Sequence, residues 1–225
     1  MLQLGLIALL SYLAGSIPTS VIVGRLFFGK DLREFGSGNA GGTNAFRTFG
    51  WKGGLPTVIV DVGKGVLATL LISRLPSPPS VPLELVRILA GCCAVIGHIW
   101  TAFAGFRGGK GVGTAAGMVA SLYPLALVAC LPAFGLVLIA GGYVSVASLM
   151  AALSFPFVLI ALDATGIQSV PPILKWFSIP IAALIFFTHR ANIGRLIRGT
   201  ENRFPKLMLF ARLWRRVKGW PAKGS

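Results

Sequence analysis

The chain has 225 residues, of which 55% are hydrophobic and only 12% charged, and its mean hydropathy is +0.80. Soluble domains carry about 25% charged residues, so this composition excludes a water-soluble globular protein and indicates a membrane protein. The three cysteines, Cys92, Cys93 and Cys130, lie in apolar runs without the spacing of a disulfide framework or a zinc site. We therefore expect neither a metal nor a cofactor.

The formal net charge of +15 would suggest a nucleic-acid partner in a soluble protein. In this chain the basic residues gather in a few segments: around the first loop, at Arg107 and Lys110, and between Arg190 and Lys223. Segments with an excess of lysine and arginine lie on the cytoplasmic side of a membrane. The charge therefore predicts membrane topology, and no nucleic-acid partner is expected.

The first three apolar runs are long enough to span a bilayer, which takes about 20 helical residues. The first, about Leu2–Gly24, has no charge before Arg25 and lacks the basic start of a signal peptide, so we expect a true span with the N-terminus outside. The second, about Gly53–Leu75, leads outward to "RLPSPPSVPLE". The third, about Leu85–Phe103, returns to Arg107 and Lys110 inside.

The region Val112–Thr188 must cross an even number of times, because the basic C-terminal segment also lies inside. Turn signals divide it into Val112–Tyr123, Leu125–Ala140, Val144–Leu162 and Ile173–Thr188, the first two of which are short for full spans. We expect an all-α polytopic membrane protein with about seven spans, five being the alternative. Residues 1–225 should form one membrane-embedded domain, with 204–225 a basic amphipathic cytoplasmic tail.

A glycine-rich polar segment, "EFGSGNAGGTNAFRTFG" (Glu34–Gly50), forms the first cytoplasmic loop. The motif Gly36-x-Gly38-x-x-Gly41 lacks the strand context of a dinucleotide site, but glycines allow backbone N–H groups to surround an anion. Hydroxyl, amide and guanidinium groups would add hydrogen bonds to a phosphate; these belong to Ser37, Asn39, Thr43, Asn44 and Arg47. A flexible linker is the alternative.

The second polar segment, "GFRGGKGVGT" (Gly105–Thr114), does not match the Walker A pattern. It places Lys110 on a turn with Gly108 and Gly109, which suits phosphate binding. Alternatively, Gly109, Gly113 and Gly117, spaced by four, form a ridge for close helix packing. Both roles are compatible.

Six further polar or ionisable residues are candidates for the site. His98 is either a site residue or an interfacial histidine beside Trp100. His189, Asn192 and Arg195 share a helix face at i, i+3 and i+6, unless that helix is simply a solvated charged one. Asp61 and Lys64, within the second span, are functional candidates by default, or neutralise each other.

Together, "GSGNAGGTNAFRTFG", "GHIWTAFAGFRGGKGVGT" and "HRANIGRLIRGTENR" resemble the three motif blocks of PlsY-type acyl-phosphate:glycerol-3-phosphate acyltransferases. The resemblance extends to "DVGKG" at Asp61 and "YVSVAS" at Tyr143, and so covers most of the chain. Gly42, Thr101 and Thr188 depart from the residues usual in that family, which bears on loop stiffness and substrate fit.

The resemblance implies a bacterial inner-membrane enzyme with a cytoplasmic active site. It would transfer a fatty acyl group from acyl phosphate to the 1-hydroxyl of sn-glycerol 3-phosphate, giving lysophosphatidic acid and phosphate, the first acylation of phospholipid synthesis. An upstream enzyme that produces acyl phosphate is a candidate partner, besides the phospholipid bilayer. The catalytic residues implied are Ser37, Thr43, Arg47, Lys110, Ser148, His189 and Asn192, with Ser145 competing with Ser148. Substrate-binding residues implied are Gly38, Asn39, Gly41, Asn44, Gly108, Gly109, His98, Arg195 and Glu201.

The chemistry is consistent with this assignment. Acyl phosphate is already activated, so no protein nucleophile is required, and an oxygen of the donor phosphate is a candidate base. Cations and backbone donors would hold two phosphates and stabilise developing charge. The alternative is a transporter or exchanger of phosphorylated solutes, which predicts inverted repeats that the sequence lacks.

Overall fold

The computed structural model describes residues 1–208, without the side chain of Lys206, and the regular elements within this range are all helices. They form two compact units, Met1–Leu125 and the part from Ala126 onward. The single domain expected over residues 1–225 stays a prediction. The expected amphipathic tail begins with a short 3-10 turn at Pro205–Leu207, and its remainder from residue 209 lies outside the described residues.

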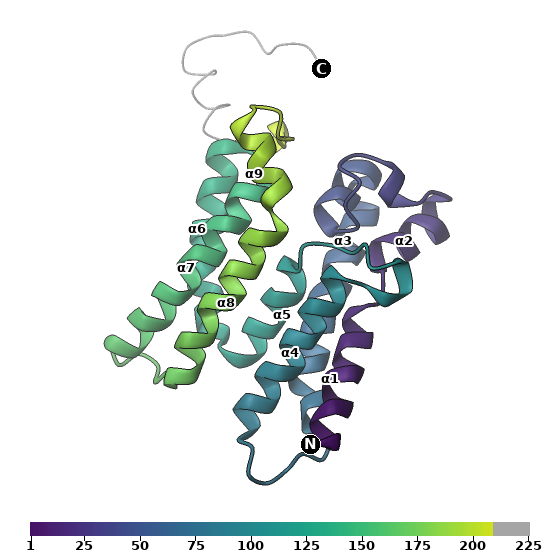
Figure 1. Ribbon diagram of the computed structural model, residues 1–225. Coiled ribbons are helices and arrows are strands. Elements are labelled where there is room, and N and C mark those ends of the chain that lie inside the picture. Colours follow the sequence, from purple (N-terminus) through teal and green to yellow (C-terminus); the bar gives the residue numbers. More distant parts are fainter. Residues whose placement is uncertain (209–225) are drawn as a thin grey trace, which may run out of the picture. The chain divides into compact units, whose positions relative to one another are not determined.

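The first unit contains α1 (Leu2–Gly15), α2 (Thr19–Phe28), α3 (Gly42–Leu70), α4 (Leu83–Ile99) and α5 (Val112–Leu122). Its principal helix pairs are α1 with α4 and α3 with α5 (Figure 1). A β-carbon on Gly97 of α4 would lie 2.1 Å from the carbonyl oxygen of Tyr12, and one on Gly117 of α5 would lie 2.0 Å from that of Val62. Small residues therefore let these backbones touch, as membrane helices require. This confirms the expected close helix packing at Gly117, whereas a β-carbon on Gly113 would make an ordinary contact with Asp61 Cβ at 3.4 Å.

The first span is broken between α1 and α2, at Ser16–Pro18. Proline has no N–H and cannot continue the hydrogen-bond ladder, so nearby carbonyl groups need other donors. The Thr101 hydroxyl donates to the carbonyl of Ser16, and Lys64 Nζ donates to that of Ile17 over 2.5 Å. The break is thus satisfied by side chains of neighbouring segments.

Helix α3 is kinked at Gly50, whose φ of 66° and ψ of −159° are not helical. Its first segment folds back on the rest: a β-carbon on Gly42 would lie 2.4 Å from Val58 Cγ2, and one on Gly54 would lie 2.1 Å from the Phe46 ring. The expectation of a loop through Gly50 is therefore wrong from Gly42 on, because apolar side chains of this turn pack against the span.

The second unit contains α6 (Pro124–Gly141), which begins at the boundary, α7 (Val144–Ala164), α8 (Pro172–Thr188) and α9 (Arg190–Ile197). Helices α7 and α8 pack together (Figure 1). The turn between them is held by Asp163, which accepts from the backbone N–H of Val170 at 2.9 Å and from Lys175 Nζ at 2.5 Å. Helix α9 is bent by 57° from α8.

Five helical segments within the described part of the chain are long and apolar enough to cross a membrane: Leu2–Phe28, Gly42–Arg74, Leu83–Ala104, Pro124–Gly141 and Val144–Ala164. A sixth results if α8 and α9 are one bent span. The 11 residues of α5 reach only about 16 Å, too short for a hydrocarbon core of about 30 Å. The all-α multi-pass architecture is confirmed, whereas seven spans remain a prediction.

Candidate active site

The loop before α3 is shaped by the buried side chain of Asn44. Its amide donates to the carbonyl groups of Leu32 at 3.3 Å and Phe35 at 2.9 Å, and its Oδ1 accepts from the N–H of Ser37 at 3.0 Å. Gly36 and Gly38 are left-handed, with φ of 60° and 70°. Asn44 was predicted as a phosphate ligand; the structure shows that its side chain folds the loop that exposes Ser37.

Helix α3 begins directly after Gly41 and has no side-chain cap. The first N–H groups of a helix have no intrahelical partner and attract anions, which the helix dipole also favours. Thr43 stands in this first turn, and Arg47 follows one turn later on the same face. The predicted phosphate ligands are therefore presented by a helix N-terminus as well as by glycines.

Lys110 lies on the turn between α4 and α5. The N–H groups of Gly108 and Gly109 donate to the carbonyl groups of Ile99 and His98, at 3.1 and 3.0 Å, so this turn is fastened to the end of α4. Gly111, with φ of 83°, precedes the first residue of α5. The turn thus presents Lys110 immediately before a second helix N-terminus.

The two glycine-rich segments meet at Gly41 and Gly109. A β-carbon on Gly41 would lie 2.9 Å from Asn39 Oδ1 and 3.9 Å from the Cα of Gly109. Gly41 itself has an extended backbone, with φ of −135°. The structure therefore brings the Ser37–Arg47 segment and the Lys110 turn close together at these two glycines.

A buried cluster of ionisable groups lies beside the Lys110 turn. Asp61 Oδ1 pairs with Lys64 Nζ at 2.7 Å, and His98 Nδ1 lies 3.6 Å from the same oxygen. The ion pair expected of Asp61 and Lys64 is present, and a functional role for the two residues stays a prediction. His98 is 7% exposed and lies against Gly109, so the alternative of an interfacial histidine is wrong.

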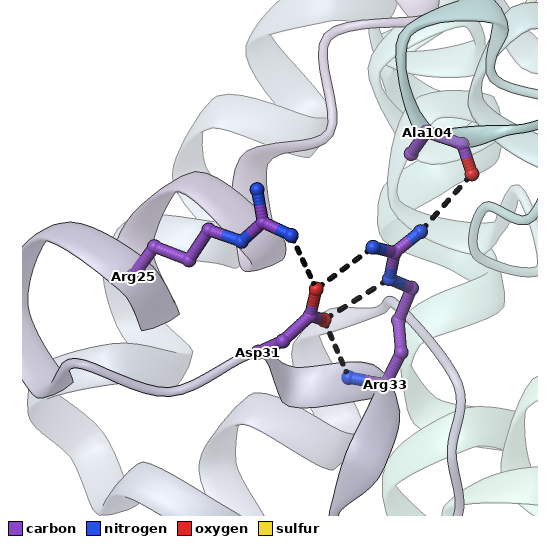
Figure 2. A network of polar contacts seen from close by, with 4 residues as sticks. All are labelled: Arg25, Asp31, Arg33 and Ala104. Carbon is purple, nitrogen blue, oxygen red and sulfur yellow. Dashed lines mark hydrogen bonds and ion pairs between the residues drawn. The ribbon is translucent and has the colours of Figure 1, made fainter.

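A second ionic network joins the first loop to the segment after α4 (Figure 2). Asp31 accepts from Arg33 through Nε at 3.0 Å and Nη2 at 2.7 Å, and from Arg25 at 2.9 Å. Arg33 Nη1 donates to the carbonyl of Ala104 at 3.1 Å. The hydrogen bonds from Arg33 hold the pKa of Asp31 well below its usual value, against the opposing effect of burial.

Asp31 and Arg33 lie outside the motifs that indicated a site in the sequence. The chain has only six acidic residues, so an aspartate between two arginines in the first polar loop was an available signal. The carbonyl that accepts from Arg33, that of Ala104, however, lies 71 residues away in the sequence.

In the second unit, Glu201 joins three predicted site residues. Its carboxylate accepts from Ser145 Oγ at 2.9 Å, Asn192 Nδ2 at 2.7 Å and Arg195 Nε at 2.7 Å. Burial alone would raise the pKa of Glu201, but these three hydrogen bonds lower it below its usual value. Ser145 is thus bonded to Glu201, and the choice between Ser145 and Ser148 as the reacting serine stays a prediction.

His189 precedes α9 and is buried, as are Asn192 and Ser148. Its Nδ1 lies 2.8 Å from the carbonyl oxygen of Ile185. A solvated helix would expose His189 and Asn192, so that alternative is wrong for these two residues. The first unit thus gathers one set of predicted residues and the second unit another.

The segment after Glu201 folds back onto the junction of α6 and α7. The N–H of Phe204 donates to the carbonyl of Gly142 at 2.8 Å, and the guanidinium of Arg203 lies 4.6 Å from the centre of the Tyr143 ring.

Within residues 1–208, no group of three His, Cys, Asp or Glu side chains could hold a metal ion, and the three cysteines are unpaired.

Residues 5–199 match the family model described as glycerol-3-phosphate acyltransferase. Relatives with that name include one from Chlorobium phaeobacteroides (strain BS1), which is 45% identical over 90% of this chain and 97% of its own length. Another, from Chlorobaculum parvum, is 44% identical over 86% of this chain and 93% of its own length. A crystal structure of PlsY (YgiH), an integral membrane glycerol 3-phosphate acyltransferase, in its glycerol 3-phosphate form has a TM-score of 0.76 at 35% identity, covering 91% of this chain and 96% of its own. Its lysophosphatidic acid form has a TM-score of 0.75 at 32% identity, with the same coverage.

Proposed function

We propose that this chain, which belongs to the glycerol-3-phosphate acyltransferase family, transfers a fatty acyl group from acyl phosphate to the 1-hydroxyl of sn-glycerol 3-phosphate. The products are lysophosphatidic acid and inorganic phosphate. The observation that carries the proposal is the similarity, over 91% of this chain, to an acyltransferase structure in a glycerol 3-phosphate form.

The reaction needs no covalent intermediate with the protein. The 1-hydroxyl oxygen attacks the carbonyl carbon of the acyl phosphate, and the bond from that carbon to the phosphate oxygen breaks. The hydroxyl proton passes to the phosphate, which leaves as hydrogen phosphate, so atoms and charge balance. The protein has to align the hydroxyl with the carbonyl and stabilise negative charge on the reacting oxygens.

Arg47, Lys110 and the N-terminus of α3 are suited to binding phosphate. Arginine offers a planar pair of donors, lysine a point charge, and the helix N-terminus free N–H groups. The proximity of Gly41 to Gly109 supports a common role for the two segments. We further propose that Ser148, His189 and Asn192 act around the reacting carbonyl, as the motif resemblance implies.

We also propose that the protein lies in the bacterial inner membrane, with its N-terminus outside and its active site and C-terminus cytoplasmic. The basic residues around the first loop, at Arg107 and Lys110, and beyond Arg190 support this orientation. An odd number of spans follows from it, and seven is our proposal. Under this topology α5 is a short apolar crossing or a partly inserted helix.

The test is product formation by the purified protein in detergent or nanodiscs. Palmitoyl phosphate and glycerol 3-phosphate should give lysophosphatidic acid and phosphate in equal amounts, measured by mass spectrometry and a phosphate assay. Palmitoyl-CoA in place of palmitoyl phosphate should give no product. Lysophosphatidic acid formed with palmitoyl-CoA as the sole acyl donor would contradict acyl phosphate as the donor. Loss of palmitoyl phosphate without lysophosphatidic acid would contradict the acyl transfer itself.

A further inference from the structure

We propose that Arg33 is a positioning residue of this enzyme, which holds the Lys110 turn at a fixed place relative to the Ser37–Arg47 segment. The inference rests on the proposed function, because it assigns Arg33 a role in the same reaction. Arg33 itself is not assigned a contact with substrate. It would act through Ala104, six residues before Lys110, to which its guanidinium donates a hydrogen bond at 3.1 Å (Figure 2).

Asp31 orients the guanidinium for this contact. It accepts three hydrogen bonds from Arg33, from the backbone N–H at 3.0 Å, Nε at 3.0 Å and Nη2 at 2.7 Å. A planar guanidinium that is bonded on one edge by a carboxylate has its remaining Nη1 directed away from it. That remaining group is the one that reaches Ala104.

On one side, Arg33 is connected to the candidate phosphate segment through hydrogen bonds of its chain neighbour Leu32. Leu32, its chain neighbour, accepts from the buried amide of Asn44, and Asn44 also accepts from the N–H of Ser37. Asn44 belongs to the first turn of α3, and Arg47 follows it by three residues. A displacement of Arg33 is therefore transmitted to Ser37 and Arg47 through a short chain of bonds.

On the other side, Ala104 is part of the strained segment that carries Lys110. Phe106 has a φ of 59°, unusual for a non-glycine residue, and Gly105 before it has a φ of 64°. The N–H of Phe106 donates to the carbonyl of Thr101 at 2.8 Å. A conformation of this kind persists only when its surroundings enforce it, and the bond from Arg33 to Ala104 is one such restraint.

The two segments approach each other at Gly41 and Gly109, where neither has a side chain that could interlock them. A β-carbon placed on Gly41 would lie 3.9 Å from the Cα of Gly109. Glycine backbone is permissive in conformation and offers no side chain to interlock with its neighbour. The hydrogen bond from Arg33 to Ala104 is directional and joins two groups that lie 71 residues apart in the sequence.

The test is a double-mutant cycle on the acyl transfer with purified protein, palmitoyl phosphate and glycerol 3-phosphate. Arg33→Ala should lower kcat/KM by about tenfold to a hundredfold, the range expected when a catalytic group is slightly misplaced. In a Lys110→Ala background, the same change should lower it by less than about twofold, because the group being positioned is gone. Where Lys110→Ala leaves no rate to measure, Lys110→Arg supplies the weakened background.

Arg33→Lys separates positioning from folding. Lysine keeps the charge beside Asp31 but cannot hold a carboxylate and a distant carbonyl with one planar fork. Its melting temperature should stay within a few degrees of wild type while the rate falls. Arg25→Ala is the matched control: Arg25 also bonds Asp31, but its side chain is 63% exposed and it should retain the wild-type rate.

Two results would overturn the inference. One is an equal loss from Arg33→Ala in the presence and absence of Lys110, which indicates a general structural role. The other is a full rate for Arg33→Lys. Since wild type and Arg25→Ala serve as active references in the same assay, either result leaves the proposed function standing. An inactive wild type contradicts the proposed function instead.

Discussion

Gly109 lies directly against the imidazole ring of His98, so that a β-carbon on Gly109 would come within 2.1 Å of Nε2. The ring is held on its other edge by Asp61, 3.6 Å from Nδ1. The imidazole is buried, with 7% of the residue exposed. The backbone of the Lys110 turn therefore packs directly against the His98 side chain of α4.

Gly109→Ala should accordingly destabilise the protein and impair turnover. Overpacking of this kind costs about 1–3 kcal/mol, and a shift of the turn would also displace Lys110. The measurement is a melting curve in detergent together with the initial rate. Gly63→Ala is the control, because a β-carbon there meets nothing within 4 Å. If Gly109→Ala matched Gly63→Ala in both measurements, the packing of Gly109 against His98 would have no energetic consequence.

Arg47→Ala and Lys110→Ala should nearly abolish turnover while leaving the protein folded. Loss of one charge-assisted contact to phosphate costs about 1.5–3 kcal/mol, roughly tenfold to over a hundredfold in rate. Initial rates against each substrate, with melting curves, check this. The exposed Lys52→Ala controls for a general loss of positive charge. Near-normal kinetics in both variants would leave Gly105–Thr114 a packing role only.

Gly38 distinguishes two reasons for a glycine-rich loop. Its φ of 70° is costly for alanine, whereas asparagine tolerates this region better. If only the conformation matters, Gly38→Asn should retain much more activity than Gly38→Ala. If backbone must approach a phosphate closely, both variants should lose activity and keep melting temperatures within a few degrees of wild type. Full activity in Gly38→Ala would contradict the phosphate-binding role of this loop.

The proposed orientation can be tested by cysteine labelling in inverted and right-side-out vesicles. In a background without Cys92, Cys93 and Cys130, single cysteines at Ser37 and Thr200 should react from the cytoplasmic side, and one at Ser80 from outside. All three positions are exposed. Labelling of all three from the same side would contradict the topology.

Asp31 should stabilise the protein at neutral pH and lose this effect only in strong acid. Its pKa is depressed in the folded protein, so its contribution is present above the unfolded value of about 3.9 and declines as pH falls through the folded value. The melting temperature of wild type should thus exceed that of Asp31→Asn by a constant amount from about pH 8 to 5. Below about pH 4 the difference should shrink. A difference that vanished between pH 6 and 5 would show that Arg33 does not hold this carboxylate in its ionised form.

The sequence by itself determined the membrane class, the apolar spans and the segments that carry the candidate site. These properties follow from local physics: hydrocarbon length requires a certain number of apolar residues, and positive charge stays on the cytoplasmic side. The i, i+3 spacing of Asp61 and Lys64 likewise predicted their ion pair, because neighbours on a helix face meet whatever the rest of the chain does.

Only the tertiary structure decided how these segments meet. Asn44 turns inward to Leu32 and Phe35, α3 folds back on Val58, and Arg33 reaches Ala104. Each relationship joins groups that are distant along the chain or whose direction depends on the packing around them. A hydrogen bond between such groups depends on positions set by the whole packed unit, and no local pattern of residues contains those positions.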